Sequence, residues 1–188
     1  NRGGRTVLHE VIIAGFGGQG VLLCGQLIAH AGMEAGYNVT WYPSYGPEMR
    51  GGTCNCSVVV SSDVVGSPVV SEASALLVFN KPSLDKFENA VQPGGLVFID
   101  SSLVDRQPKR EDVTVYNVPA NAIADGLGSS LVANMVMLGA FLEATDLLAD
   151  ELVEVALKEI LPERRHHLLP LNMQAVAAGR KVVREHGK

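Results

Sequence analysis

The first third of the chain alternates short apolar runs with a segment of helical spacing. Residues 9–14 contain three β-branched residues in a row and predict a buried strand. Residues 18–35 place apolar side chains at helical spacing and are followed by Gly36, which predicts a helix that stops there. Residues 38–42 are rich in β-forming residues and predict a second strand, which completes a right-handed βαβ unit.

Short strands and turns are predicted for the middle of the chain. Residues 53–61 and 64–70 read as two strands around a turn at 61–63, a spacing that favours a hairpin. After them, a turn is predicted at Pro93-Gly94, a helix at residues 82–91, and strands at residues 75–79, 95–99 and 113–118. From there the pattern is almost wholly helical, with helices predicted at residues 119–125, 131–144, 150–160 and 173–186.

These elements predict an α/β fold. We expect a Rossmann-like three-layer sandwich with a mostly parallel sheet, a β-hairpin insertion and a helical C-terminal part. The length of 188 residues predicts a single domain over residues 1–188. Hydrophobic residues make up 47% of the chain but aromatic residues only 5%, so aliphatic side chains must fill the core. Such a composition suits buried parallel strands covered by helices.

Charge and cysteine usage exclude several classes of protein. The formal net charge of −5 argues against a nucleic-acid partner, which needs a surplus of clustered basic residues. No apolar run reaches membrane-spanning length, so we expect a soluble, cytoplasmic protein without a membrane partner. Cys24, Cys54 and Cys56 contain no C-x-x-C pair, which fits a reducing compartment. Cys54 and Cys56 alternate along a predicted strand without further ligands, so we expect core packing and no metal site.

A glycine-rich turn, with the sequence AGFGGQG at residues 14–20, joins the first predicted strand to the first helix. The glycines at the G-x-G-x-x-G spacing are Gly15, Gly17 and Gly20, and Gly18 and Gln19 complete the turn. Glycine lets the backbone approach an anion, and the N-terminus of the helix offers free N–H donors. The turn therefore predicts an anion or phosphate site. Tight packing of the strand against the helix is the alternative explanation of the glycines.

A nicotinamide dehydrogenase would need one more feature. An acidic residue about 20 residues further on, at the end of the second strand, holds the ribose hydroxyls in such enzymes. Here the predicted second strand ends in Trp41-Tyr42-Pro43, without an acid and without an arginine for a 2′-phosphate. The sequence thus favours an anion site that lacks a ribose clamp.

A second unusual loop has the sequence YPSYGPEMRGG at residues 42–52. Two prolines and three glycines exclude a regular element there. Arg50 precedes Gly51 and Gly52, so a guanidinium fork lies beside backbone N–H groups, which suits a phosphate or a carboxylate. The loops after the first two strands of a doubly wound sheet lie at the same carboxyl edge, so we expect the two loops to meet. An interface loop in which Arg50 pairs with Glu48 or with another subunit is the alternative.

One amide, Asn134, falls on an apolar helix face together with Leu138 and Phe141. A buried amide without partners costs about 1 to 3 kcal/mol. We therefore expect a structural hydrogen bond from Asn134 that ties its helix to the glycine turn, and keep contact with a ligand as the alternative.

Three motifs together resemble the gamma subunit of 2-oxoacid:ferredoxin (acceptor) oxidoreductases. They are residues 15–20, residues 44–52 and the segment NMVMLG at residues 134–139, and they occur in the family's order. The resemblance covers nearly the whole chain. The segment NKPSLDKF at residues 80–87 resembles the 2-oxoglutarate and branched-chain branches of the family more than the pyruvate branch.

The resemblance implies an oxidoreductase of the EC 1.2.7 type. A 2-oxoacid, with 2-oxoglutarate as the first candidate, and coenzyme A would give an acyl-CoA, carbon dioxide and reduced ferredoxin. Thiamine diphosphate and iron–sulfur clusters are implied in partner subunits, and this sequence indeed lacks a ferredoxin-type cysteine run and a Gly-Asp-Gly motif. The chain alone is therefore expected to be inactive, and no catalytic residue can be named in it.

The family's gamma subunit is associated with the coenzyme A side of the reaction, which implies a set of binding residues. The set is Gly15, Gly17, Gly18, Gln19, Gly20, Tyr45, Gly46, Arg50, Gly51, Gly52, Lys81 and Asn134. The implied partners are alpha and beta subunits, a delta subunit where the complex has one, and ferredoxin through the complex. The isolated chain could also form a homodimer under this resemblance. A free-standing NAD(P)-binding dehydrogenase and a non-catalytic scaffold subunit are the alternative functions.

Overall fold

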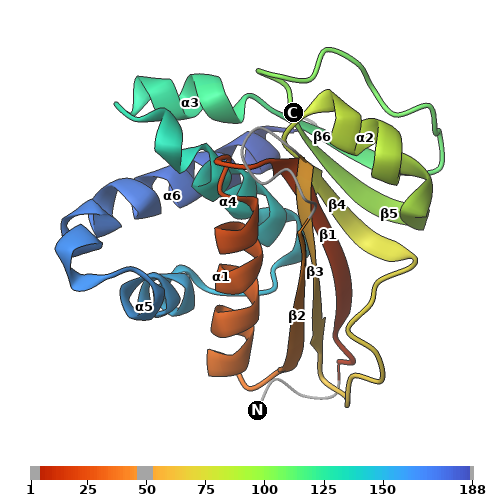
Figure 1. The fold of residues 1–188 in the computed structure, drawn as a ribbon, viewed down its shortest axis with the longest axis horizontal. Helices are drawn as coiled ribbons and strands as arrows, with labels where there is room; N and C mark the ends of the chain where they lie inside the picture. The colour runs from red at the N-terminus through yellow and green to blue at the C-terminus, as the bar shows by residue number, and fades with distance from the viewer. Residues whose placement is uncertain (1–4, 46–52, 187–188) are drawn as a thin grey trace.

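The computed structural model of the chain describes residues 5–45 and 53–186 and contains a six-stranded sheet (Figure 1). The strands lie in the order β2-β3-β1-β4-β5-β6. Their bounds are Leu8–Phe16 (β1), Asn38–Tyr45 (β2), Thr53–Ser61 (β3), Ala73–Val78 (β4), Val91–Asp100 (β5) and Thr114–Val118 (β6). The predicted α/β class is confirmed.

Strand β3 gives the sheet its mixed character. It pairs antiparallel with β1 on one side and with β2 on the other, whereas β1, β4, β5 and β6 form parallel pairs. Strands β1 and β2 therefore run in the same direction, as a βαβ unit requires, but β3 lies between them. Phe16 is opposite Thr53 and Tyr45 is opposite Cys54, so β1 and β2 end where β3 begins. We call this side of the sheet, where the parallel strands end, the carboxyl edge.

Helices cover the two faces of the sheet unequally. Figure 1 shows α1, α4, α5 and α6 on one side and α2 on the other. The bounds are Val21–Glu34 (α1), Lys81–Phe87 (α2), Ala120–Gly126 (α3), Ala133–Thr145 (α4), Asp150–Ile160 (α5) and Leu169–Glu185 (α6), with 3₁₀ turns at Glu88–Ala90, Ser130–Val132 and Glu163–Leu168. The result is the predicted three-layer arrangement with a helical C-terminal part.

The alternation of side chains along β1 divides the core in two. Val11 and Ile13 are fully buried in a large cluster under α1, α4 and α6, whereas Ile12 belongs to a smaller cluster on the α2 side. Successive strand residues point to opposite faces, so a run of apolar residues is the expected pattern for a strand covered on both sides.

Helix α4 is the most buried helix of the described structure, because it lies between the sheet and α6. Its residues from Ala133 to Leu142 are all buried. Two glycines let α4 and α6 approach closely: a side chain at Gly139 would meet the backbone of Val176, and one at Gly179 would meet the backbone of Val136. The packing of α6 thus depends on two positions without a Cβ atom.

The predicted hairpin of residues 53–61 and 64–70 is wrong in its second half. Residues 53–61 form β3, but residues 64–70 form no strand, and β3 has β1 and β2 as its partners. Gly66 and Pro68 interrupt the apolar run. Val70 is buried in the smaller core cluster and Val65 packs against it, whereas Val64 and Val69 are exposed.

Two boundaries around residue 90 also differ from the prediction. The expected helix at residues 82–91 ends at Phe87, continues as a 3₁₀ turn and gives way to β5 at Val91. Pro93 and Gly94, predicted as a turn, lie inside β5. They occupy an irregularity in the pairing of β4 with β5, and Gly94 has a φ of 79°. A bulge explains why turn-forming residues occur within a strand.

The C-terminal predictions are largely confirmed. Helix α5 has the predicted bounds, α3 and α4 differ by one or two residues, and α6 starts at Leu169 rather than at residue 173. Pro170 is the reason for the early start, since proline is well accepted in the first turn of a helix. Among the helices of residues 5–45 and 53–186, none has the length and apolarity that crossing a membrane requires.

Candidate functional site

The glycine turn between β1 and α1 is built around two positive φ angles. Gly18 has a φ of 91° and Gly20 a φ of 75°, a region that favours glycine. Gly20 also precedes α1 as its N-cap, and no side chain caps the first turn there. A side chain at Gly15 would crowd Gln19, Phe79 and Val21, with the nearest atom 2.6 Å away. Packing thus explains Gly15, whereas a Cβ at Gly18 would meet nothing within 4 Å.

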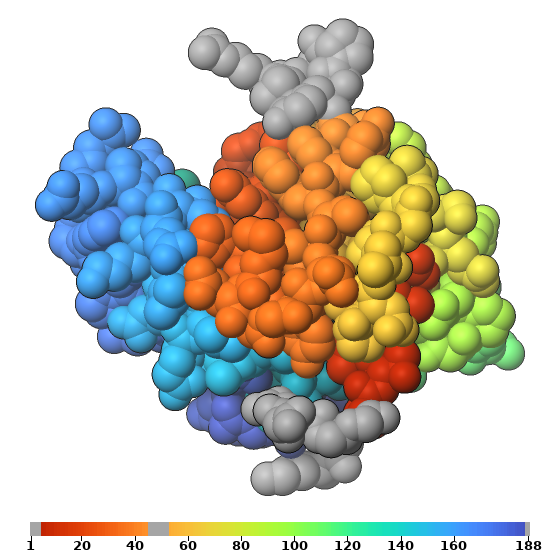
Figure 2. All heavy atoms as spheres, turned by 90° about the horizontal axis from the view of Figure 1, so that it is seen from below, coloured from red at the N-terminus to blue at the C-terminus, as the bar shows by residue number. Residues whose placement is uncertain are grey.

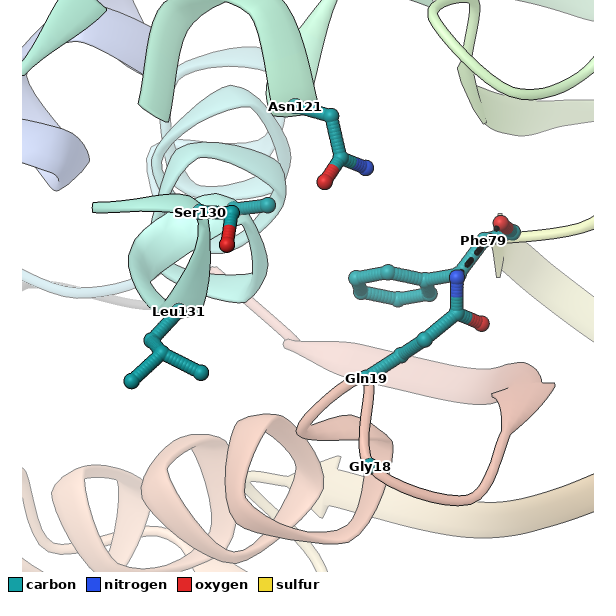
Figure 3. Close-up of a pocket in the computed structure, with 7 residues that line it drawn as sticks. Gly18, Gln19, Phe79, Asn121, Ser130 and Leu131 are labelled. Atoms are coloured by element: carbon teal, nitrogen blue, oxygen red, sulfur yellow. Dashed lines mark hydrogen bonds between the residues drawn. The ribbon is translucent and has the colours of Figure 1, made fainter. Parts of the chain in front are cut away.

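The side-chain amide of Gln19 stabilises the conformation of the turn by hydrogen bonds (Figure 3). Its Oε1 accepts a hydrogen bond from the backbone N–H of Phe16 at 2.7 Å, and its Nε2 donates to the carbonyl of Phe79 at 3.1 Å. Phe79 follows β4 directly. One amide therefore joins the ends of two neighbouring parallel strands and fixes the conformation of the turn. This role for Gln19 is structural, and it leaves little of the amide free for a ligand.

Asn134 makes the structural contact that the sequence predicted. The side chain lies in the first turn of α4 and is 4% exposed. Its Nδ2 donates to the carbonyl of Gly20 at 3.3 Å, and its Oδ1 accepts from the backbone N–H of Met135 at 3.0 Å. A side chain at Gly20 would collide with Asn134. The absence of a Cβ at Gly20 thus allows the contact between α4 and the turn.

A small pocket of about 150 Å³ opens beside the turn at the carboxyl edge (Figure 3). The residues that line it are Gly18, Gln19, Phe79, Asn121, Ser130, Leu131 and Ala133. They come from the turn, the residue after β4, the start of α3, the 3₁₀ turn before α4 and the first residue of α4. Leu131 is 81% exposed, so the pocket has an apolar rim at the surface. The described lining contains amide, hydroxyl and backbone groups but no charged side chain.

Asp100 positions the α3 side of this pocket. It ends β5, is fully buried, and accepts hydrogen bonds from the backbone N–H groups of Ser102 at 3.1 Å and Ala120 at 3.2 Å. Its other oxygen accepts from the amide of Asn121 at 2.5 Å. Burial raises the pKa of the Asp100 carboxyl, and the hydrogen bonds from Asn121 and the backbone oppose this shift. Asp100 therefore holds Asn121 at the pocket.

Of the predicted site residues, the structure brings together the glycine turn and Asn134. Gly46, Arg50, Gly51 and Gly52 lie outside the described residues, so the expected meeting of the two loops stays a prediction. The strand ends agree with it, because Tyr45 at the end of β2 and Thr53 at the start of β3 are close to the end of β1. Gly17 is partly exposed within the turn.

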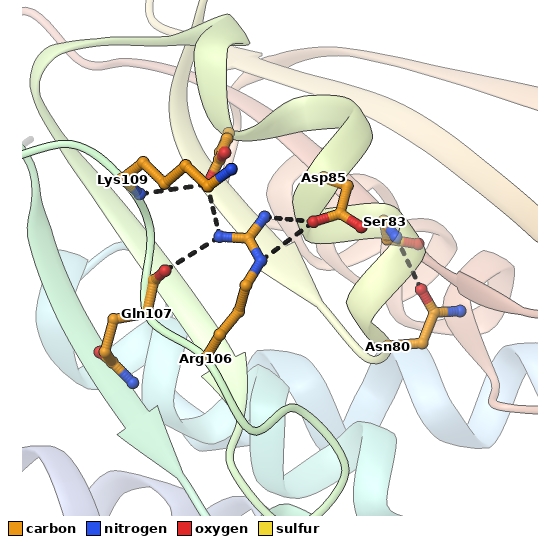
Figure 4. Close-up of polar contacts among 7 residues, drawn as sticks. Asn80, Ser83, Asp85, Arg106, Gln107 and Lys109 are labelled. Atoms are coloured by element: carbon orange, nitrogen blue, oxygen red, sulfur yellow. Dashed lines mark hydrogen bonds and ion pairs between the residues drawn. The ribbon is translucent and has the colours of Figure 1, made fainter.

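Lys81 lies at the same edge but does not line the pocket. It is the first residue of α2, is exposed, and follows Asn80, whose Oδ1 caps the helix by accepting from the backbone N–H of Ser83 at 2.8 Å. Figure 4 shows how Arg106 holds α2 in place: its Nε donates to Asp85 at 3.0 Å and its guanidinium also binds Glu88 at 2.9 Å. These charges serve α2 and leave the Lys81 ammonium at the surface.

The pocket residues Asn121, Ser130 and Leu131 were missed by the sequence analysis. Their position in the sequence, after β6, could have indicated them. The chain returns to the carboxyl edge after every parallel strand, and ligands bind at this edge in α/β sheets. The predicted motifs follow the first two strands and include Lys81 and Asn134, but none covers the residues after β6 that line the pocket.

Cys54 and Cys56 pack in the core, as predicted, and so does Cys24. All are buried and free, and burial raises the pKa values of Cys24 and Cys56, that of Cys56 to about 12. Three protonated, buried thiols do not provide the four thiolates of an iron–sulfur cluster.

The sheet order argues against a dinucleotide site. In a nicotinamide-binding fold, the strand that carries the ribose acid runs parallel beside the first strand. Here antiparallel β3 occupies that place, and β2 is one strand further away. The geometry supports binding of a small anionic group at the turn rather than of a dinucleotide.

Comparisons with known proteins agree on one family. Residues 10–182 match the family described as pyruvate ferredoxin/flavodoxin oxidoreductase. The chain is 40% identical over 179 residues to the ketoisovalerate oxidoreductase subunit VorA of Methanothermobacter thermautotrophicus, covering 94% of this chain and 37% of that protein. It is 33% identical over 180 residues to the 2-oxoglutarate synthase subunit KorC of Methanocaldococcus jannaschii, covering 94% of each. The chain thus spans about a third of the VorA relative but nearly all of the KorC relative.

Solved structures show the same fold. The keto/oxoacid ferredoxin oxidoreductase gamma subunit of Geobacter sulfurreducens superposes with a TM-score of 0.79 at 29% identity, covering 93% of this chain and 98% of that one. The 2-oxoglutarate:ferredoxin oxidoreductase of Magnetococcus marinus, solved with 2-oxoglutarate, coenzyme A and succinyl-CoA, superposes with a TM-score of 0.85. This second match has 24% identity and covers 94% of this chain and 31% of that one, so it shows that the two chains share a fold.

Proposed function

This chain belongs to the pyruvate ferredoxin/flavodoxin oxidoreductase family, and we propose that it is the gamma component of a 2-oxoacid:ferredoxin oxidoreductase. In the proposed reaction a 2-oxoacid loses carbon dioxide, its acyl group passes to coenzyme A, and the electrons released pass to ferredoxin. The observation that carries the proposal is the open glycine turn and its pocket at the carboxyl edge, within a fold shared with a gamma subunit.

The role of this chain in the reaction is to bind part of coenzyme A. The first turn of α1 has backbone N–H groups without a side-chain cap, and Gly18 leaves the turn open to an approaching phosphate. Asn121 and Ser130 add polar groups, and exposed Leu131 offers an apolar surface. A pocket of about 150 Å³ holds one phosphate with its neighbouring atoms, so the rest of coenzyme A would extend over the surface or onto a partner chain.

Thiamine diphosphate and the iron–sulfur clusters belong to other chains in this proposal. The three thiols of this chain are buried on α1 and β3, which does not fit cluster ligation. The chemistry of decarboxylation and electron transfer therefore needs alpha and beta subunits, with ferredoxin as the final acceptor. We place the assembly in the cytoplasm, in keeping with the free cysteines.

For the 2-oxoacid, 2-oxoglutarate is the first candidate, because KorC matches this chain over nearly its whole length. Ketoisovalerate is the second, because the identity to VorA is higher, at 40% against 33%. The side chain of the substrate is expected to be read by residues of other chains.

The proposal is tested by producing the chain together with thiamine-binding and ferredoxin-like subunits from the same organism. We expect a stable assembly that reduces ferredoxin only when a 2-oxoacid and coenzyme A are both present. Assays with 2-oxoglutarate, ketoisovalerate and pyruvate would identify the substrate. A chain that forms no assembly with thiamine-dependent subunits, or an assembly that is equally active without this chain, would contradict the proposal.

A further inference from the structure

Three potential metal ligands converge on the helical side of the molecule, away from the glycine turn. His30 and Glu34 lie one turn apart on α1, and Glu159 lies on α5. One ligand atom from each lies within 4.8 Å of the other two. The Nε2 of His30 contacts the carboxylate of Glu159 directly and lies 3.9 Å from the Oε1 of Glu34. Figure 2 shows the face on which α1 and α5 adjoin, in orange and blue.

The two carboxylates of this cluster are in an unfavourable electrostatic position. Glu34 is the last residue of α1 and Glu159 is the last but one of α5, so both lie at the negative ends of helix dipoles. They also repel each other at this separation. Within residues 5–45 and 53–186, His30 is the only partner with which either forms an ion pair, and Lys158 pairs with neither.

One imidazole cannot satisfy both carboxylates. The Nε2 atom of His30 carries at most one proton, so it donates to Glu159 or to Glu34 but not fully to both. A divalent cation between the three groups would instead be bound by all of them at once, and would neutralise both carboxylates. The convergence of these groups from two helices therefore favours a positive charge between them, which no lysine or arginine of residues 5–45 and 53–186 supplies by an ion pair.

We propose that His30, Glu34 and Glu159 bind a divalent transition-metal ion of the Zn²⁺ type. Imidazole nitrogen and carboxylate oxygen are both ligands of Zn²⁺, and three protein ligands with water in the fourth position are typical of its open sites. The nitrogen ligand disfavours Ca²⁺ and Mg²⁺, which prefer oxygen. Because the ligands come from α1 and α5, the ion would link these helices and stabilise their contact. The site is independent of coenzyme A binding.

The test uses the purified, tag-free and reduced chain after treatment with a chelator. Titration with Zn²⁺ in a calorimeter should show one ion per chain, and Zn²⁺ should raise the melting temperature. Loss of a residue that only hydrogen-bonds to a metal ligand typically lowers metal affinity about 10- to 100-fold. Loss of a ligand itself should cost at least as much, so His30→Gln and Glu159→Gln should each weaken Zn²⁺ binding at least about tenfold. Exposed His167 provides the matched control, and His167→Gln should bind Zn²⁺ as the wild type does.

Three results would overturn the proposal. The first is Zn²⁺ binding that is equal in the wild type and in both site variants, provided that circular dichroism shows all proteins folded. The second is binding of Ca²⁺ as strong as that of Zn²⁺, which would indicate general attraction of cations to two carboxylates. An absence of stoichiometric Zn²⁺ binding to the wild type would likewise reject the site and leave a simple contact between histidine and glutamate.

Discussion

The glycines of the turn at the carboxyl edge and the glycines between α4 and α6 are needed for different reasons. At Gly139 and Gly179, a Cβ atom would meet the backbone of the opposite helix, which cannot move aside. At Gly18, a Cβ would meet nothing within 4 Å, and the residue is exposed. The first pair is therefore required by packing, whereas Gly18 is required by its positive φ and leaves open space above the turn.

The same difference is found within the glycine turn, between glycines that packing requires and a glycine that can contact a ligand. Gly15 and Gly20 of the G-x-G-x-x-G spacing resemble the packing glycines, because Gln19, Phe79 and Asn134 fill the space beside them. Gly18, which lies outside that spacing, faces open space. A glycine motif thus marks the position of the site, but surrounding atoms decide which glycine can face a ligand.

The largest effect is expected at the contact between α4 and α6. Gly139→Ala would force the two helices apart, because the new methyl group meets the backbone of Val176. Overpacking typically costs 1 to 3 kcal/mol, and a backbone obstacle places this variant at the upper end, about 3 kcal/mol. Urea unfolding followed by circular dichroism measures the change in the free energy of unfolding.

A matched control lies at the end of α3. Gly126 has open space around its Cβ position, so Gly126→Ala should leave the chain as stable or stabilise it by about 0.5 kcal/mol. Equal stability of the Gly139→Ala and Gly126→Ala variants would show that α4 and α6 do not depend on close backbone contact.

The second effect concerns the link between α4 and the turn. Asn134→Asp replaces the Nδ2 donor by an oxygen that faces the carbonyl of Gly20 in a buried place, which should cost about 2 kcal/mol. Hydrogen exchange at the amides of the turn should become faster as well. Asn89→Asp changes an exposed amide in the same way and serves as the control. If both variants lose equal stability, the bond from Asn134 does not hold the turn.

The smallest effect on stability is expected within the turn itself. Gly18→Ala introduces no clash, so only the positive φ opposes it, and a cost of about 1 kcal/mol follows. Gly20→Ala should cost more, because its Cβ would also collide with Asn134. Thermal unfolding of the two variants side by side checks the order. The reverse order would show that the space above Gly18 is filled.

Much of the fold could be predicted from the periodicity of apolar residues. The helices after Pro119 were found because long stretches there contain helix-forming residues without strand signals, and α5, which has clear helical spacing, matched in both bounds. Residues 64–70 misled the prediction because their four valines form no strand: Val65 and Val70 pack against the smaller core cluster, whereas Val64 and Val69 are exposed. Local pattern does not distinguish these uses, and the insertion of β3 between β1 and β2 depends on pairing partners far away in sequence.

The site could be predicted only in part, for a related reason. The glycine turn and Asn134 carry local signals, namely spacing and an amide on an apolar face. Asn121 and Ser130 carry none, since polar residues near helix starts are common. Asn121 reaches the pocket because Asp100 holds it there, and Ser130 because the 3₁₀ turn before α4 returns to the carboxyl edge. Likewise, His30 and Glu34 share a helix face, but only the packing of α5 brings Glu159 to them.

The central claim, that the pocket beside Gly18 holds a negatively charged part of coenzyme A, is tested most directly at Ser130. This residue is exposed and lines the pocket, so Ser130→Glu places a carboxylate there without disturbing the core. Ser71→Glu adds the same charge at an exposed position before β4, at the opposite edge of the sheet. In the assembled oxidoreductase, we expect Ser130→Glu to raise the dissociation constant of coenzyme A at least about tenfold, a loss of about 1.4 kcal/mol, and Ser71→Glu to leave it unchanged. Equal dissociation constants for the wild type and both variants would contradict the claim and favour a scaffold role for this chain.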